Sequence, residues 1–346
     1  MYTRTQTRAL KVGNVPLGGG APVSVQTMAS VDPHDAAALL RQIESSAALG
    51  CDIFRLTVPD VEAARVLGEI RAKSPLPLVA DIHFDYRLAL ASIEAGADAL
   101  RLNPGNIGSR DKVQAVARAA KEKRIPIRVG VNGGSLEKGE TLVSSALKHV
   151  KILEDEGFRD IVVSVKASDA MKTVSAYREL AQRTDCPLHL GVTEAGTLIP
   201  GTVRSASALA ILLAEGIGDT IRVSLTDKPE REVKVGLEIL RALDLRVAGP
   251  AITSCPTCGR TKVDLFRVAG EVEDALEKLR VAEPSRRLPH VAVMGCAVNG
   301  PGEAKGADVA LCGGDGEFLI FVKGEVVGKT SEKDAARKVM EYVVSI

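Results

Sequence analysis

A pattern that repeats eight times limits the folds open to this chain. From about residue 23, short aliphatic runs alternate with amphipathic segments, and Gly, Pro or Asp often stands where they join. Runs of this length indicate strands, and the amphipathic segments between them, such as 35–49 and 111–123, indicate helices. The predicted strands are 23–28, 53–58, 78–82, 99–103, 127–131, 161–165, 188–193 and 220–224.

Eight strand–helix units are the number that closes a (β/α)8 TIM barrel, an α/β fold. The rival architecture is an open doubly wound sheet, which would more often carry a glycine fingerprint after its first strand, and none appears there. Hydrophobic residues make up 45% of the chain, but aromatics only 3% and Trp none, so the core must be aliphatic. Such a core suits a parallel sheet buried on both faces, and we predict the barrel.

The length predicts a second domain. A chain of 346 residues fits a barrel of about 250 residues and an appendage of about 100. The alternation stops after a helix near 231–243, at Ala248-Gly249-Pro250, so we place the domain boundary near residue 246. Residues 1–22 look like a short hairpin that closes the bottom of the barrel. The remainder, 247–346, is predicted to be a small α+β domain with helices at 261–280 and 332–344 and strands at 291–294, 309–312, 318–323 and 326–329.

Charge and hydropathy exclude several classes of partner. The chain has 45 Lys and Arg against 44 Asp and Glu, so no global field draws it to nucleic acid or to an anionic membrane. Residues 1–8 lack the apolar stretch of a secretory signal, and no later run approaches a membrane span. We expect a cytoplasmic protein that binds neither nucleic acid nor membrane.

Four of the predicted strands carry an arginine between aliphatic residues. Because a strand interior disfavours an unpaired charge, the recurrence suggests one shared cavity, at the end of the barrel where this fold builds active sites. Lys166 follows the sixth strand and adds a fifth cation. Arginine forks match phosphate oxygens, so a diphosphate is the natural ligand. The arginines are Arg55, Arg101, Arg128 and Arg222, and neutral donors beside them are Asn103, Asn132, Ser164 and Ser224.

Carboxylates near the strand ends leave a second interpretation open. Each arginine could instead pair with a carboxylate such as Asp81 or Glu194, or extend out of the barrel. Glu194 follows the seventh strand, among the cations; shielded from bulk water, it could also act as a general acid or base. His83 stands near Asp81 at another strand end and has the same ambiguity.

Cysteines in the C-terminal part indicate metal or redox chemistry. Cys255 and Cys258 form a Cys-x2-Cys pair, and Cys296 lies in a glycine-rich turn. The pair alone is compatible with zinc ribbons, dithiol redox sites and iron–sulfur clusters. Glycines around Cys296 would let backbone amides approach cluster sulfides, which favours an iron–sulfur cluster held by three thiolates with one open iron.

Three further cysteines complete the set of six. A structural zinc held by Cys312 together with the three cysteines above is the alternative to a cluster. Cys51 and Cys186 lie apart in the barrel part, and we expect them to be buried structural thiols.

Both sets of motifs resemble the bacterial 4-hydroxy-3-methylbut-2-enyl diphosphate synthase family, which acts near the end of the methylerythritol phosphate route to isoprenoids. The resemblance covers nearly the whole chain, and no motif position departs from the family pattern. The large insertion of plant-type members is absent. The most specific segments are 254–260, 294–308 with Asn299-Gly300-Pro301-Gly302-Glu303, 100–106 and 192–196.

The resemblance implies a site built from both domains. It implies a [4Fe-4S] cluster held by Cys255, Cys258 and Cys296 and, through a carboxylate oxygen, by Glu303, whereas Cys312 would be structural. It also implies that 2-C-methyl-D-erythritol 2,4-cyclodiphosphate binds through the barrel cations and displaces Glu303, with Glu194 as acid or base. Two electrons, delivered singly by flavodoxin or ferredoxin, would then open the ring and remove a hydroxyl as water.

The resemblance further implies a homodimer in which the cluster domain of one subunit closes over the barrel of the other. Two other classes of function remain open on the residues alone. One is a redox-inactive TIM-barrel transferase or aldolase, for example of the pteroate-synthase type, with a structural zinc tail. The other is a non-catalytic electron carrier, which would have no need of cations at the strand ends.

Overall fold

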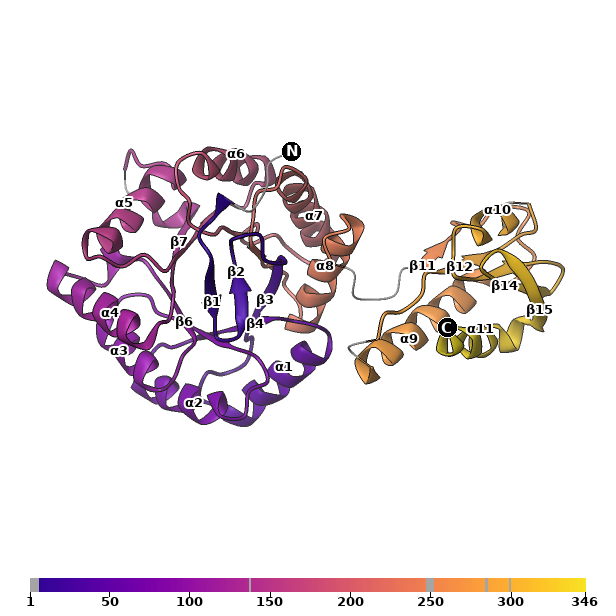
Figure 1. Ribbon diagram of the computed structural model, residues 1–346, viewed down its shortest axis with the longest axis horizontal. Helices are drawn as coiled ribbons and strands as arrows, with labels where there is room; N and C mark the ends of the chain where they lie inside the picture. Colours follow the sequence, from indigo (N-terminus) through magenta and orange to yellow (C-terminus); the bar gives the residue numbers. More distant parts are fainter. Residues whose placement is uncertain (1–5, 137, 247–251, 284–285, 299) are drawn as a thin grey trace. The chain divides into compact units, whose positions relative to one another are not determined.

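The computed structural model describes residues 6–136, 138–246, 252–283, 286–298 and 300–346. The chain divides into two compact units, Met1–Arg246 and Val247–Ile346. Figure 1 shows the first unit as a ring of helices around a barrel of strands. The Ala248-Gly249-Pro250 segment, where we placed the end of the alternation, lies outside the described residues.

The first unit is a parallel eight-stranded barrel, as predicted. Its strands pair in the order β8-β7-β6-β5-β4-β3-β10-β9, so every strand–helix unit lies beside the next. A single parallel bridge between Val163 and Leu188 joins β8 to β9 and nearly closes the ring. This order excludes the doubly wound sheet, in which the strand order reverses. The strands are β3 (Ser24–Met28), β4 (Ile53–Thr57), β5 (Leu78–Asp81), β6 (Ala99–Leu102), β7 (Ile127–Asn132), β8 (Ile161–Lys166), β9 (His189–Leu190) and β10 (Thr220–Ile221).

Eight helices of this unit follow the eight strands, and aspartates at the joints begin several of them. Asp35, Asp60 and Asp169 each accept a backbone N–H of the first helical turn, which satisfies a donor that the helix itself cannot pair. The helices are α1 (Ala36–Ala48), α2 (Val61–Arg71), α3 (Tyr86–Glu94), α4 (Arg110–Lys123), α5 (Leu142–Asp155), α6 (Ala170–Ala181), α7 (Leu198–Ala214) and α8 (Pro229–Ala242).

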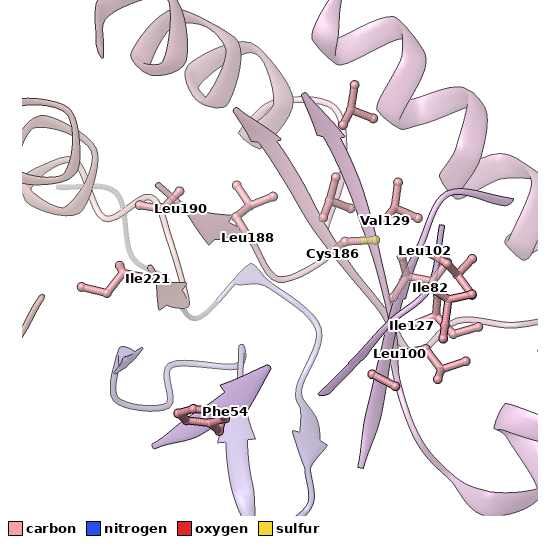
Figure 2. Close-up of a cluster of buried hydrophobic side chains, with 14 of the residues drawn as sticks. Phe54, Ile82, Leu100, Leu102, Ile127, Val129, Cys186, Leu188, Leu190 and Ile221 are labelled. Atoms are coloured by element: carbon pink, nitrogen blue, oxygen red, sulfur yellow. The ribbon is translucent and has the colours of Figure 1, made fainter. Parts of the chain in front are cut away.

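The hydrophobic core lies between the barrel wall and the helices. Successive residues of a strand point to opposite faces, and the aliphatic ones, such as Leu100 and Val129, belong to the large buried cluster shown in Figure 2. Cys51 and Cys186 are buried free thiols in the same cluster, and burial raises the pKa of Cys51 to about 12. The alternate positions face the lumen, and many of them are polar or charged.

One side chain from α6 joins the two strands at the closing bridge. The Tyr177 hydroxyl accepts a hydrogen bond from the Val165 N–H of β8 at 3.1 Å and donates one to the His189 carbonyl of β9 at 2.5 Å. Tyr177 is fully buried. The hydroxyl therefore pairs backbone groups at a place where the strand ladder is short.

A hairpin closes the amino-terminal end of the lumen. Strands β1 (Leu10–Val12) and β2 (Val15–Leu17) pair antiparallel across a turn in which Gly13 has a φ of +57°. Arg8 ties the preceding segment to Glu154 and Asp185 through contacts of 2.6 Å. The hairpin packs on residues near the starts of four barrel strands, in a cluster of Val12, Leu17, Ile53, Val79, Ala99 and Val162.

The second unit is a five-stranded sheet in the order β11-β12-β13-β14-β15, parallel in its first three strands and antiparallel in the last two. Two elements were not predicted. Strand β11 is only three residues long, and the short helix α10 lies in the glycine-rich turn. The elements are β11 (Ile252–Ser254), α9 (Leu265–Ala282), β12 (Val291–Met294), α10 (Gly300–Ala304), β13 (Val309–Gly313), β14 (Glu317–Val322), β15 (Glu325–Ser331) and α11 (Ala335–Ser345).

The apolar contacts of the β1–β2 hairpin predict that it stabilises the barrel as a plug, that is, by closing the amino-terminal end of the lumen. Leu17 is 2% exposed, and Leu17→Ala would lower the free energy of unfolding by about 2 to 5 kcal/mol. Urea unfolding followed by circular dichroism measures the change. Lys11→Ala, on the exposed side of the same hairpin, is the control and should leave the midpoint unchanged; equal effects of the two substitutions would contradict the plug.

Candidate active site

The structure brings the five predicted cations together in the lumen. They come from four strands and from the position after β10, at alternate positions that face inward. Burial first, and then Arg128, Arg222, Arg55 and Arg101, hold the pKa of Lys166 well below its usual value. Mutual influence of this kind requires the charges to lie in one poorly solvated space. The cations are Arg55, Arg101, Arg128, Lys166 and Arg222.

Asp81, at the end of β5, compensates two of these cations. Its carboxylate lies 3.2 Å from Arg101 Nη1, 3.5 Å from Arg55 Nη2 and 3.5 Å from His83 Nε2. Burial would raise the pKa of Asp81, but Arg55, the hydrogen bond from His83 and Arg101 outweigh it, and the pKa is lowered. The interpretation that arginines pair with carboxylates therefore holds for Arg55 and Arg101.

Glu232 compensates a third cation, and sequence reasoning did not find it. Its two oxygens accept hydrogen bonds from Arg222 at 3.2 and 3.3 Å, from the Thr27 hydroxyl at 2.8 Å and from the Leu225 N–H at 3.0 Å. It lies in the first turn of α8, where an acidic residue is ordinary because it complements the helix dipole. Only its burial distinguishes it, and burial of a helix residue was not visible in the sequence.

Arg128 and Lys166 have no carboxylate partner within the described ranges. The Arg128 guanidinium lies 3.4 Å from the Ser164 hydroxyl and from Gln26 Oε1, and both of these are neutral. Burial, followed by Arg55 and Arg101, holds the pKa of Arg128 well below its usual value. A buried charge without a counter-ion is costly, so these two residues are the candidates for binding an anion.

Glycines make room for this group of cations. A Cβ on Gly191 would stand 2.8 Å from Lys166 Nζ and 2.5 Å from the Arg222 carbonyl oxygen. A Cβ on Gly130 would stand 2.8 Å from Arg101 Nε. Any side chain at either position would displace a cation or the backbone, so the absence of a side chain here belongs to the geometry of the site.

The carboxyl ends of β5, β6 and β7 form a pocket of about 430 Å³ above Arg101. Asn103 Oδ1 accepts the Gly130 N–H at 3.0 Å, which leaves the Asn103 amide nitrogen as its donor group. Asn103 is buried and Asn132 half-buried, and both line the pocket. Ser224 is half-buried beyond β10. The pocket is lined by Ile82, His83, Phe84, Arg101, Asn103, Asn106 and Asn132.

Glu194 does not lie where we expected it. We expected a carboxylate shielded from bulk water, but the structure leaves Glu194 exposed. The cause is local, because β9 ends at Leu190 and the chain turns outward before Glu194. Its φ of +52° is a left-handed conformation, which costs a residue with a Cβ about 1 kcal/mol or more.

Two of the three cysteines of the second unit lie at the carboxyl ends of neighbouring strands. Cys255 follows β11, and Cys296 follows the neighbouring parallel strand β12, so the carboxyl ends of the two strands bring them near each other. The Gly295 N–H points to Cys255 Sγ at 3.4 Å. Cys258 is exposed in the next turn, and Glu303 is exposed on α10. Asn299, quoted in the motif, lies outside the described residues.

The donor types at this edge suit an iron–sulfur cluster. None of the three cysteines is in a disulfide, and none is fully buried. Among the described residues, however, no three Cys, His, Asp or Glu side chains lie close enough together to hold a metal ion. The residues therefore fit such a group in chemistry and in position along the edge, while the structure does not show them gathered around it.

Cys312 differs from these thiols in its burial, although Cys255 packs against the cluster of side chains that contains it. It is buried in β13, in a cluster with Met294, Ala304 and Phe321. A Cβ on Gly300 would stand 2.8 Å from Cys312 Sγ, so the thiol packs directly under the start of α10. This is the surrounding of a structural thiol.

Comparison with known proteins identifies relatives along the whole chain. The GcpE TIM-barrel domain matches residues 7–237, and the GcpE protein C-terminal domain matches residues 251–345. A 4-hydroxy-3-methylbut-2-en-1-yl diphosphate synthase (flavodoxin) of Geobacter sulfurreducens is 55% identical over 99% of this chain and 98% of its own. The protein of the same name from Clostridium acetobutylicum is 51% identical over 98% of this chain and 99% of its own.

Solved structures support the fold of the first unit alone. Dihydropteroate synthase of Xanthomonas albilineans superimposes with a TM-score of 0.51 at 16% identity, covering 69% of this chain and 98% of that one. The Yersinia pestis enzyme gives a TM-score of 0.51 at 14% identity, covering 68% and 98%. Across the described ranges, no helix combines the length and the apolar character that crossing a membrane requires.

The compensation by Asp81 predicts a pH-dependent stability. Asp81→Asn would lower the free energy of unfolding at pH 7 by about 3 to 5 kcal/mol, because it leaves Arg55 and Arg101 without their buried counter-charge. A carboxylate with a lowered pKa stabilises the fold above its unfolded pKa, and this stabilisation is lost as the pH falls. The difference between the wild type and the variant should therefore shrink below about pH 4.

Denaturant unfolding between pH 7 and pH 3 measures this difference. Glu94→Gln, at an exposed position of α3, is the control and should change stability little at any pH. A gap between wild type and Asp81→Asn that stayed constant across the range would show that the Asp81 charge is not what stabilises the lumen.

Proposed function

This chain belongs to the GcpE family, and from that membership we propose how its residues divide the family reaction between the two units. The family members named above are 4-hydroxy-3-methylbut-2-en-1-yl diphosphate synthases. The chain is accordingly an iron–sulfur oxidoreductase of isoprenoid biosynthesis. Its reaction is the reductive ring opening and dehydroxylation of 2-C-methyl-D-erythritol 2,4-cyclodiphosphate to 4-hydroxy-3-methylbut-2-enyl diphosphate.

The observation that carries the assignment of the substrate site is the pair of uncompensated cations, Arg128 and Lys166. A cyclic diphosphate supplies the negative charge that these two residues lack. Arg55, Arg101 and Arg222 are held in place by carboxylates before the substrate arrives, so little reorganisation is needed on binding. Asn103, Asn132 and Ser224 would donate neutral hydrogen bonds to the remaining oxygens.

Burial makes this arrangement effective. The lumen around Arg128 and Lys166 excludes most water, and charge–charge attraction is stronger there than at the surface. Glu194 is assigned the proton transfer, because the leaving hydroxyl must depart as water and requires a proton donor. Two electrons and two protons convert the cyclic diphosphate into the product and one water.

Cys255, Cys258 and Cys296 would hold three irons of a [4Fe-4S] cluster, and Glu303 the fourth. Such a cluster, when bound, supplies single electrons and a Lewis-acidic iron. A carboxylate is a weaker ligand for this iron than a thiolate, which makes Glu303 the displaceable member of the set. The relatives' names specify flavodoxin, so a reduced flavodoxin is the proposed electron donor and ferredoxin the substitute.

Two further expectations are part of the proposal. A homodimer is one of them, and Ile199 and Val203 on α7 are among the exposed apolar residues that it could cover. A cytoplasmic location agrees with the bacterial biosynthetic relatives. The alternative of a redox-inactive transferase or aldolase loses its support, because the likeness to dihydropteroate synthase concerns the barrel fold and the family match includes the cysteine-bearing unit.

Anaerobic purification tests the proposal as a whole. We expect a coloured protein that contains iron and sulfide and oxidises a reduced dye only when the cyclodiphosphate is added. A colourless protein with stoichiometric zinc and neither iron nor sulfide would overturn the cluster assignment. A coloured protein without cyclodiphosphate-dependent oxidation would overturn the substrate.

The anion site predicts a loss of turnover in Lys166→Met. Removing one charge-assisted contact to the diphosphate should lower kcat/KM by about 10- to 100-fold. Arg128→Met should act in the same direction. The control is Lys123→Met at the exposed end of α4, which keeps the same change of net charge and should retain full activity. Unchanged turnover in Lys166→Met and Arg128→Met would contradict the pocket.

The proposed cluster ligands predict that substitutions of Glu303 and of Cys312 affect the cluster differently. Glu303→Ala should alter the electron paramagnetic resonance spectrum of the reduced cluster and make one iron labile to chelation. Cys312→Ser should leave iron content and spectrum as in the wild type, since the thiol packs in the core. A normal spectrum for Glu303→Ala, or loss of iron in Cys312→Ser, would require a different set of ligands.

A further inference from the structure

A small cavity lies inside the barrel, between the hairpin plug and the cations. It has a volume of about 20 Å³, somewhat more than the 10 to 15 Å³ that one water needs on the same kind of measure. Its lower boundary is apolar and includes Val12 and Leu17 from the hairpin. Four polar side chains also line it: Gln26, Arg128, His189 and Thr220.

One polar atom of this lining lacks a partner. His189, on β9, is fully buried, and its Nε2 has no hydrogen-bond partner among the described residues. The other ring nitrogen lies 3.4 Å from the Thr220 hydroxyl. Burial and then the neighbouring Lys166 and Arg128 hold the pKa of His189 well below its usual value, so the ring is neutral. A neutral ring has one donor nitrogen and one acceptor nitrogen.

Arg128 is also weakly held on this side. Its hydrogen bonds to Gln26 and Ser164 are both long, at 3.4 Å, and neither partner carries a charge. A buried guanidinium with five N–H donors normally satisfies more of them. The cavity is therefore lined by a histidine whose ring nitrogen has no described partner and by an arginine with donors to spare.

We propose that this cavity binds one internal water, which links His189 Nε2, Gln26 Oε1 and the Arg128 guanidinium and so holds Arg128 toward the diphosphate site. His189 is then a positioning residue for Arg128. The water satisfies the ring nitrogen, and with Gln26 and Arg128 it has three partners, within the two to four that internal waters have. The inference rests on the proposed function only in what it says about the diphosphate.

A crystal structure of the complete protein at high resolution tests the water itself. A density peak within about 2.7 to 3.2 Å of His189 Nε2 and of a second polar atom of the lining supports the proposal. An empty cavity, a cavity filled by a rotated side chain, or an anomalous signal from chloride would overturn it. This measurement does not depend on turnover.

Two substitutions of His189 test its effect on Arg128. His189→Leu removes both ring nitrogens, and KM for the cyclodiphosphate should rise about tenfold while kcat changes little, because the water and Arg128 act on binding. His189→Gln keeps a donor and an acceptor and should restore most of the affinity. Iron content should equal that of the wild type in both variants.

Ser205→Ala provides the matched control. Ser205 is fully buried and its hydroxyl has no described partner, but it lies on α7, outside the lumen. Its KM should equal that of the wild type. Equal KM values for His189→Leu and His189→Gln, or a wild-type KM in His189→Leu, would overturn the role of His189. A wild-type protein that holds the water but does not turn over the cyclodiphosphate would overturn the proposed function and leave the water site intact.

Discussion

Positive charge enclosed in the lumen is the constraint on which the rest of this structure depends. Five cations share a poorly solvated space, and among the described residues they face two carboxylates, Asp81 and Glu232. Desolvated like charges repel, so each cation needs a counter-charge in the protein or from a ligand. Three arginines have the first, and Arg128 and Lys166 require the second. A bound anion would therefore remove the largest electrostatic penalty of this barrel.

Because charged side chains occupy the lumen, the main hydrophobic core lies between the strands and the surrounding helices. Barrels of this fold usually fill their interior with layers of branched aliphatic side chains. Here most aliphatic side chains of the strands belong to the large cluster outside the lumen (Figure 2), and an apolar layer lies inside where Val12 and Leu17 of the hairpin meet the strand starts. The hairpin thus supplies, from a separate segment, the apolar layer that separates the charges from the solvent below.

Features that depend on short stretches of sequence were predictable, and those that depend on long-range placement were not. The barrel followed from local periodicity, and Arg55, Arg101 and Arg128 were found because each interrupts an aliphatic run. Glu232 was missed because nothing in α8 marks which acidic residue turns inward. The exposure of Glu194 was missed because it follows from where β9 ends. In the second unit, β11 was too short to carry a pattern of its own, and the gathering of the cysteines around a cluster stays a prediction.

The Tyr177 hydroxyl has a consequence for how the barrel wall is assembled. From β3 to β8 the strands pair through three or more registered residues, but β9 and β10 each pair through only two, and one bridge joins β8 to β9. The barrel is therefore well paired from β3 to β8 and closes through a short, weakly paired junction at β9 and β10. A side chain from α6, outside the barrel, strengthens this junction, because its hydroxyl donates a hydrogen bond to the backbone carbonyl of the buried His189. A change that moved α6 away from the barrel at Tyr177 would therefore weaken the pairing of β8 with β9 and open the lumen between these two strands.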